Sequence, residues 1–188
     1  MPINQWYELG PFTVFDLETT GFSPVNDRII EIAAIRIELD GSLTEWETLV
    51  NPQRPIPPKI EGITGINNEM VQNAPSFAQI GNKITDLANK STLIAHNARF
   101  DLAFLQESLF RCGLMRWQGK TLDSLILAKQ TFGNQPSYSL QALKDSLMLH
   151  GKYGKAHRAM ADVKLTLKLV EKIFTTLLER NCQSQDLL

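Results

Sequence analysis

The chain has few cysteines and no long hydrophobic run. Its 188 residues include only Cys112 and Cys182, and no two cysteines stand at the spacing of a zinc motif. We therefore expect two free thiols, a cytoplasmic location, and neither a disulfide scaffold nor a zinc site. The apolar runs are shorter than the roughly 20 residues that cross a bilayer, and the N-terminus lacks a secretion-signal pattern. We expect no membrane partner.

A strong net charge is also missing. The formal net charge is −1, and hydrophobic and charged residues make up 43% and 21% of the chain. These values are typical of globular proteins and exclude a disordered, collagenous or coiled-coil chain. The length predicts a single domain over residues 1–180, followed by a short tail over residues 181–188. Residues 1–70 hold 11 acids and 4 bases, an asymmetry that can mark an anionic partner or arise by chance.

The first half of the chain has the patterns of strands. Short apolar or alternating segments predict strands over residues 11–17, 28–39 and 43–50. The Asp40-Gly41 pair predicts a hairpin turn between the last two. Four prolines within residues 51–58 predict a loop.

The second half has the patterns of helices around two short strands. Apolar spacing and stop signals predict helices over residues 76–88, 98–112, 124–130, 139–149 and 159–180. Short apolar segments predict strands over residues 92–96 and 120–123. Strands followed by helices around a central strand indicate an α/β or α+β domain.

Two acids close the first predicted strand. Asp16 and Glu18 are two residues apart, so their side chains share one face of that strand. Two like charges in an apolar setting repel each other, and Mg²⁺ or Mn²⁺ would remove that repulsion. The alternative is an exposed strand end with no ligand. Thr19, Thr20 and Gly21 follow, with two hydroxyls that could donate to a ligand and a glycine that permits a sharp turn.

A third acid and an acid–histidine pair lie at two later junctions. Asp101 follows the 92–96 strand in the first turns of a helix, where an acid also favours the helix dipole. His157 and Asp162 are five residues apart, which would separate them by about 140° on one helix. The spacing predicts Asp162 in the final helix and His157 in the loop before it, where an imidazole could act as a general base. The alternatives are a surface acid and an exposed, inactive histidine.

The combination of these residues is more informative than any one of them. The four acids and the histidine fall in three segments, each at the end of a strand or the start of a helix. Ligands of α/β sheets bind at such junctions. The set supplies oxygen ligands for two metal ions and a base for a water molecule, which suits hydrolysis of a phosphodiester.

Three segments resemble the motifs of the DEDDh (DnaQ-like) 3′–5′ exonucleases. They are FDLETTGF at residues 15–22, LIAHNARFDLAFL at 93–105 and HRAMAD at 157–162. Their order and spacing match the family, and the resemblance covers about residues 10–175. The chain is most similar to the epsilon proofreading subunit of bacterial DNA polymerase III and to the PolC-type exonuclease domain. The resemblance implies an α/β, ribonuclease H-like fold, with a five-stranded mixed sheet flanked by helices.

The resemblance also implies roles for individual residues. Two divalent cations, Mg²⁺ or Mn²⁺, would be held by Asp16, Glu18, Asp101 and Asp162, with Asp16 bridging the pair. His157 would activate the attacking water, and nucleoside 5′-monophosphates would leave from a 3′ end. The pocket for the 3′ nucleotide would include Leu17, Thr19, Thr20, Ile63 and Thr64. Thr64 stands where the epsilon subunit tends to carry histidine, so the match there is nearer to the PolC-type domain.

The expected substrate is a single-stranded or frayed 3′ end of DNA, and a DNA polymerase subunit is an expected partner. The basic residues Lys144, Lys152, Lys155 and Arg158 surround His157, where a phosphate backbone would arrive. A solvated basic loop is the alternative. A stand-alone repair exonuclease and an RNA-trimming exoribonuclease stay open. A non-catalytic nucleic-acid-binding module predicts a missing acid or histidine, whereas all five are present.

Overall fold

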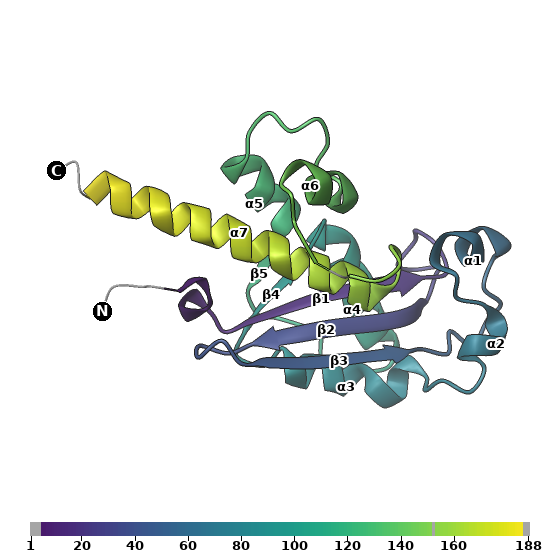
Figure 1. The fold of residues 1–188 in the computed structure, drawn as a ribbon. Helices are drawn as coiled ribbons and strands as arrows, with labels where there is room; N and C mark the ends of the chain where they lie inside the picture. The colour runs from purple at the N-terminus through teal and green to yellow at the C-terminus, as the bar shows by residue number, and fades with distance from the viewer. Residues whose placement is uncertain (1–4, 152, 186–188) are drawn as a thin grey trace.

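A five-stranded mixed sheet organises the chain in our computed structural model (Figure 1). The structure describes residues 5–151 and 153–185, with the backbone alone for residues 181–185. The strand order is β3-β2-β1-β4-β5, in which β1 pairs antiparallel with β2 and parallel with β4. The strands are β1 (Phe12–Thr19), β2 (Ile29–Ile37), β3 (Leu43–Leu49), β4 (Thr92–Ala95) and β5 (Thr121–Asp123).

Helices cover both faces of the sheet. Figure 1 shows α5, α6 and α7 over one face and α3 and α4 over the other. The helices are η1 (Trp6–Leu9), α1 (Pro58–Thr64), α2 (Asn68–Val71), α3 (Phe77–Leu87), α4 (Ala98–Arg111), α5 (Ser124–Thr131), α6 (Leu140–Ser146) and α7 (Ala159–Gln185). In the described part of the chain, no helix is both long and apolar enough to span a bilayer.

The alternation of β1 decides which side of the sheet carries its acids. Phe12 and Val14 pack in the hydrophobic cluster that includes residues of α7, whereas Phe15 and Leu17 pack in the cluster that includes residues of α4. Side chains alternate between the two faces of a strand. The even-numbered acids Asp16 and Glu18 therefore continue the α7 face, beyond the apolar part of the strand.

An irregularity in β2 lies next to the second of these acids. Glu18 pairs with Glu31, but Thr19 pairs with Ile29, so one extra residue of β2 lies between the two pairs. That residue, Ile30, is fully buried in a small third cluster with Ile56 and other apolar residues around α1. Such bulges redirect the strand locally. Here the bulge lies at the start of β2, where Ile30 is buried with Ile60 of α1.

The predicted fold class and all five strands are confirmed, and the differences lie in the helices. Helices α1 and α2 and the short η1 were not expected. α1 begins at Pro58, where proline is favourable because its missing N–H needs no partner in the first turn. α6 ends at Ser146, earlier than predicted, and Met148 adopts a left-handed backbone two residues later. α7 continues to Gln185, beyond its predicted end at Arg180.

Candidate active site

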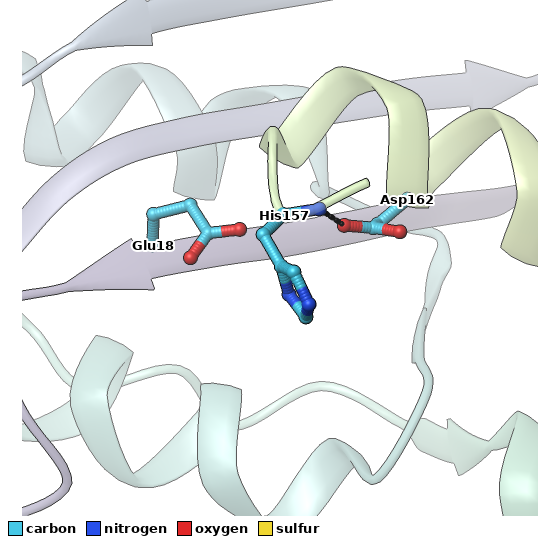
Figure 2. A group of neighbouring side chains, drawn as sticks. All are labelled: Glu18, His157 and Asp162. Atoms are coloured by element: carbon cyan, nitrogen blue, oxygen red, sulfur yellow. Dashed lines mark hydrogen bonds between the residues drawn. The ribbon is translucent and has the colours of Figure 1, made fainter. Parts of the chain in front are cut away.

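The three sequence segments that carry the predicted ligands meet at one end of the sheet. Glu18 lies near the end of β1, Asp162 in the first turn of α7, and His157 in the loop before α7 (Figure 2). A carboxylate oxygen of each acid and a ring nitrogen of the histidine all lie within 4.8 Å of one another. The predicted placement of Asp162 in the helix and His157 in the loop is confirmed.

The acid of the second motif approaches from the opposite layer. Asp101 lies in the first turn of α4 and is only 3% exposed. Its Oδ1 accepts a hydrogen bond from the backbone N–H of Leu17 at 3.2 Å. Leu17 stands between Asp16 and Glu18, so this bond ties the start of α4 to the part of β1 that carries both acids.

The backbone around Asp101 is fixed by neighbouring polar side chains. The Asp123 carboxylate accepts hydrogen bonds from the N–H groups of Asn97 and Ala98 at 3.0 and 3.1 Å. Asn97 has a left-handed backbone with φ 66°. His96 lies 3.0 Å from the Ser124 hydroxyl through Nδ1, and its Nε2 lies 2.9 Å from the Tyr138 carbonyl oxygen. These contacts hold the turn from β4 into α4.

The acids share an electrostatic environment that disfavours their charge. Burial, followed by the carboxylates of Asp162 and Glu31, raises the pKa of Glu18 from 4.5 to about 8. Burial also raises the pKa of Asp16, and the neighbouring carboxylates of Asp101 and Glu18 add to this. The pKa of Asp101 rises to about 8, again mainly through burial. Hard oxygen donors whose charges repel in a partly buried cluster fit a divalent cation.

His157 is held by its backbone. Its N–H donates a hydrogen bond to Asp162 Oδ2 at 2.9 Å (Figure 2). The residue has a left-handed φ of 59°, which L residues other than glycine adopt uncommonly. Its side chain is exposed. The imidazole is therefore accessible to solvent beside the carboxylates.

The sequence-based prediction did not include an ion pair that lies beside these acids, between a buried glutamate and a partly exposed arginine. Glu31 on β2 is 3% exposed and lies directly opposite Glu18 in the strand pairing. The Arg158 guanidinium binds it, with Nη2 at 2.6 Å from Oε1. A single glutamate inside the apolar run over residues 29–37 was the available signal, since a buried carboxylate requires a cationic partner.

This ion pair changes the expected role of one basic residue. Arg158 was predicted to face a phosphate backbone, but its guanidinium is bound to Glu31. Lys144 lies over the Tyr153 ring, with Nζ 5.7 Å from the centroid. Lys155 is exposed. Lys152 lies outside the described residues.

The five residues predicted for the 3′-nucleotide pocket differ in exposure. Leu17, Thr19, Thr20 and Thr64 are buried, whereas Ile63 is 36% exposed. The hydroxyls of the threonines donate to protein acceptors, namely Gly21 O, Asp27 Oδ1 and Ile60 O. Their part in substrate binding stays a prediction. Because the three hydroxyl protons are already donated within the protein, the exposed side chain of Ile63 is the group most accessible to a nucleotide.

The end of α1 lies beside the loop that carries His157. A Cβ added at Gly65 would stand 2.8 Å from Lys155 Nζ. The end of the Lys155 side chain therefore reaches the residue that follows Ile63 and Thr64. Figure 1 shows α1 and the start of α7 toward the same end of the sheet.

The mixed sheet, with four acids and a histidine at one of its ends, defines a nuclease of the ribonuclease H-like fold. The chain belongs to the exonuclease family: the family model RNase_T, described as Exonuclease, matches residues 13–170. Members of this family are exonucleases that depend on divalent metal ions.

Individual relatives support this assignment. The chain is 37% identical over 175 residues to the DNA polymerase III PolC-type protein of Caldanaerobacter subterraneus subsp. tengcongensis, covering 93% of this chain and 12% of the relative. It is 35% identical over 176 residues to the DNA polymerase III subunit epsilon of Treponema pallidum, covering 92% and 78%. Exonuclease X in complex with 5′ overhanging duplex DNA has a TM-score of 0.70 at 28% identity, covering 88% of this chain and 92% of that one.

The shared region is a small part of several longer proteins. The chain spans 12%, 18% and 12% of three of the curated relatives that it matches. The family assignment therefore applies to the exonuclease unit of these longer proteins.

Proposed function

We propose that this chain hydrolyses DNA from the 3′ end and releases nucleoside 5′-monophosphates, with a role in polymerase proofreading. The observation that carries the proposal is the grouping of Glu18, His157 and Asp162 within 4.8 Å, beside the half-buried Asp16 and the buried Asp101. The relatives named as polymerase III subunits support a replicative role and a cytoplasmic location.

The carboxylates would hold two divalent cations, Mg²⁺ or Mn²⁺. The proposed ligands are Asp16, Glu18, Asp101 and Asp162. When bound, such ions act as Lewis acids on the phosphoryl oxygens and stabilise charge on the entering and leaving oxygens. The raised pKa values of Glu18 and Asp101 support this assignment. Repulsion between carboxylates contributes to both increases, and a bound cation would offset that repulsion.

His157 would act as the general base. The oxygen of a water molecule attacks phosphorus, its proton passes to the imidazole, and the bond from phosphorus to the 3′ oxygen of the preceding nucleotide breaks. That oxygen takes a proton from solvent, and the proton on the imidazole returns to solvent. An imidazole suits this role because its ordinary pKa lies near neutral pH.

The 3′ nucleotide would be bound beside the acids by Leu17, Thr19, Thr20, Ile63 and Thr64. The position of α1 next to the His157 loop supports the inclusion of Ile63 and Thr64. A single-stranded or frayed DNA end is the proposed substrate, and a polymerase subunit is the proposed partner. The duplex DNA bound by the structural relative, exonuclease X, agrees with DNA as the substrate class.

The test uses purified protein and two oligonucleotides of matched sequence, one DNA and one RNA, each labelled at the 5′ end. With Mg²⁺, we expect a ladder of products that shortens from the 3′ end of DNA. EDTA and the variant Asp16→Ala should abolish it.

Each alternative gives a different pattern. Faster shortening of RNA would replace the proofreading role with RNA trimming. Binding of DNA without shortening would favour a non-catalytic nucleic-acid-binding module. Shortening that persists in Asp16→Ala would overturn the assignment of the site.

A further inference from the structure

One buried carboxylate attaches the first turn of α7 to β2. Glu31 accepts hydrogen bonds from the Arg158 guanidinium and from the Ala159 N–H. Arg158 Nη2 lies 2.6 Å from Oε1, Arg158 Nε lies 3.1 Å from both oxygens, and the Ala159 nitrogen lies 2.9 Å from Oε2. Charge-assisted bonds of this forked kind are the strongest and most directional in proteins.

Arg158 also begins the helix. Its carbonyl oxygen accepts the N–H groups of Ala161 and Asp162 at 2.8 and 3.2 Å, which makes Arg158 the residue that caps α7. Glu31 therefore holds both the side chain of the cap and the first helical N–H. A shift of α7 along β2 would leave this buried carboxylate unpaired, which is strongly unfavourable.

His157 stands one residue before this attachment. Its N–H is bound by Asp162, a residue of the helix that Glu31 anchors. Within residues 5–151 and 153–180, no hydrogen bond holds the imidazole ring itself. The place of the imidazole therefore depends on the backbone of His157. Asp162 and Glu31 hold that backbone on its C-terminal side, through His157 N–H and Ala159 N–H.

The preceding part of the loop is attached elsewhere. The Tyr153 hydroxyl donates to the carbonyl oxygens of Leu149 and His150, which lie toward α6. Gly154 has a left-handed φ of 95°, a conformation that glycine adopts at little cost. The Tyr153 hydroxyl thus joins this segment to the residues that follow α6, whereas the attachment to β2 comes from Glu31.

We propose that Glu31 is a positioning residue for hydrolysis, which places His157 by binding Arg158 and Ala159. The inference rests on the proposed function, in which His157 receives the proton of the attacking water. The Glu31 oxygens are occupied by donors from the protein, so Glu31 acts through His157. The competing account is that Glu31 acts on Glu18, which lies opposite it, through charge alone.

The test is a double-mutant cycle in the full chain, measured on the labelled DNA with Mg²⁺. Glu31→Gln should lower kcat by about 10- to 100-fold, the range typical of groups that orient a site's ligands, and leave KM unchanged. In the His157→Ala background, Glu31→Gln should cause no further loss. Two residues that act as one unit show this non-additivity. The affinity for Mn²⁺, followed by its magnetic resonance signal, should be unchanged by Glu31→Gln.

Two further variants serve as companion and control. Arg158→Lys keeps the positive charge but loses the forked geometry, and should lower kcat in the same His157-dependent way. Lys164→Gln removes the 2.9 Å pair with Glu45, which also joins α7 to the sheet, and should leave kcat unchanged. Circular dichroism and thermal unfolding establish that each variant is folded.

The outcomes separate this inference from the function on which it rests. Wild-type kcat in Glu31→Gln would overturn the inference, and so would a loss that multiplies with that of His157→Ala. If Glu31→Gln does not fold, Arg158→Lys decides by the same two criteria. A His157→Ala variant that is as fast as wild type would overturn the proposed role of His157 itself, whatever the result at Glu31.

Discussion

Glu18 and Glu31 lie directly opposite each other where β1 and β2 pair, and the Arg158 guanidinium binds the second of them. Two carboxylates opposite each other in a sheet are destabilising on their own. The guanidinium neutralises Glu31 and lowers the pKa of Glu18, against the larger effect of burial. One of the two acids is thereby held in an ion pair, and the other is available to a cation.

Replacing Asp16 should separate activity from stability. Asp16→Asn removes a carboxylate whose pKa is raised by burial and by its acidic neighbours. We expect kcat to fall by more than about 100-fold, equivalent to about 3 kcal/mol of transition-state stabilisation. In EDTA, the melting temperature should equal or exceed that of wild type. The exposed Asp145→Asn serves as a control with unchanged kcat, and a large drop in melting temperature for Asp16→Asn would contradict the account.

The metal-free protein should lose stability as pH rises. The ordinary pKa of Glu18 is 4.5, and burial and neighbouring carboxylates raise it to about 8 in the folded chain. Between these values the folded chain binds more protons than the unfolded chain, so the free energy of unfolding falls with increasing pH. Thermal unfolding in EDTA from pH 4.5 to 8 should show a falling melting temperature.

Two measurements complete this prediction. Mg²⁺ should raise the melting temperature most at the upper end of the range, where the carboxylates are charged. Glu18→Gln should flatten the dependence in EDTA. A melting temperature that rises with pH in the metal-free wild type would be the contrary result.

Loss of the His157 imidazole should reduce catalysis but preserve the fold. We expect His157→Ala to lower kcat by about 100- to 10,000-fold, the usual contribution of a general base. The left-handed backbone at this position favours glycine, so His157→Gly should be at least as stable as His157→Ala. Single-turnover rates and urea unfolding measure the two effects. His150→Ala, at an exposed histidine of the preceding loop, is the matched control, and equal losses in both variants would reject the assignment.

His96 should contribute stability only in its neutral form. Burial lowers its pKa from the usual 6.5, so its contribution is present above that value and is lost as pH falls through the folded pKa. His96→Phe leaves the Ser124 hydroxyl and the Tyr138 carbonyl without the ring nitrogens, and should cost about 1–3 kcal/mol near neutral pH. Urea unfolding with His150→Phe as control measures this cost, and an unchanged midpoint would show that both groups find other partners.

Local patterns were sufficient to predict most of the fold and part of the site. The two-residue period of a strand put Asp16 and Glu18 on one face, and the helical period separated His157 from Asp162. Both are properties of short segments, and the structure agrees with both. Asp101 was singled out by its place after a predicted strand, and the family resemblance then implied its role as a metal ligand. Its contact with β1 joins segments that are distant in the chain.

The features that were not predicted depend on contacts between distant segments, or on local patterns that indicated a different structure. Glu31 and Arg158 are 127 residues apart in the chain, and no pattern in either segment indicates that the two side chains pair. The prolines of residues 51–58 indicated a loop and obscured α1, although Pro58 occupies a position where helices accept proline. No helix stop signal stands near Arg180, and α7 continues beyond its predicted end there.

The placement of η1 has a consequence for how this unit can be joined to others. Trp6 stacks on Phe12 and Phe174, which brings the start of the described chain beside the later part of α7. Figure 1 shows η1 and the later part of α7 at the end of the molecule away from α1, and Glu18 lies at the other end of β1 from η1. A polypeptide fused at η1 or at the end of α7 would therefore leave the molecule at the end opposite the carboxylates. Such a fusion would not block the approach of a DNA end to them.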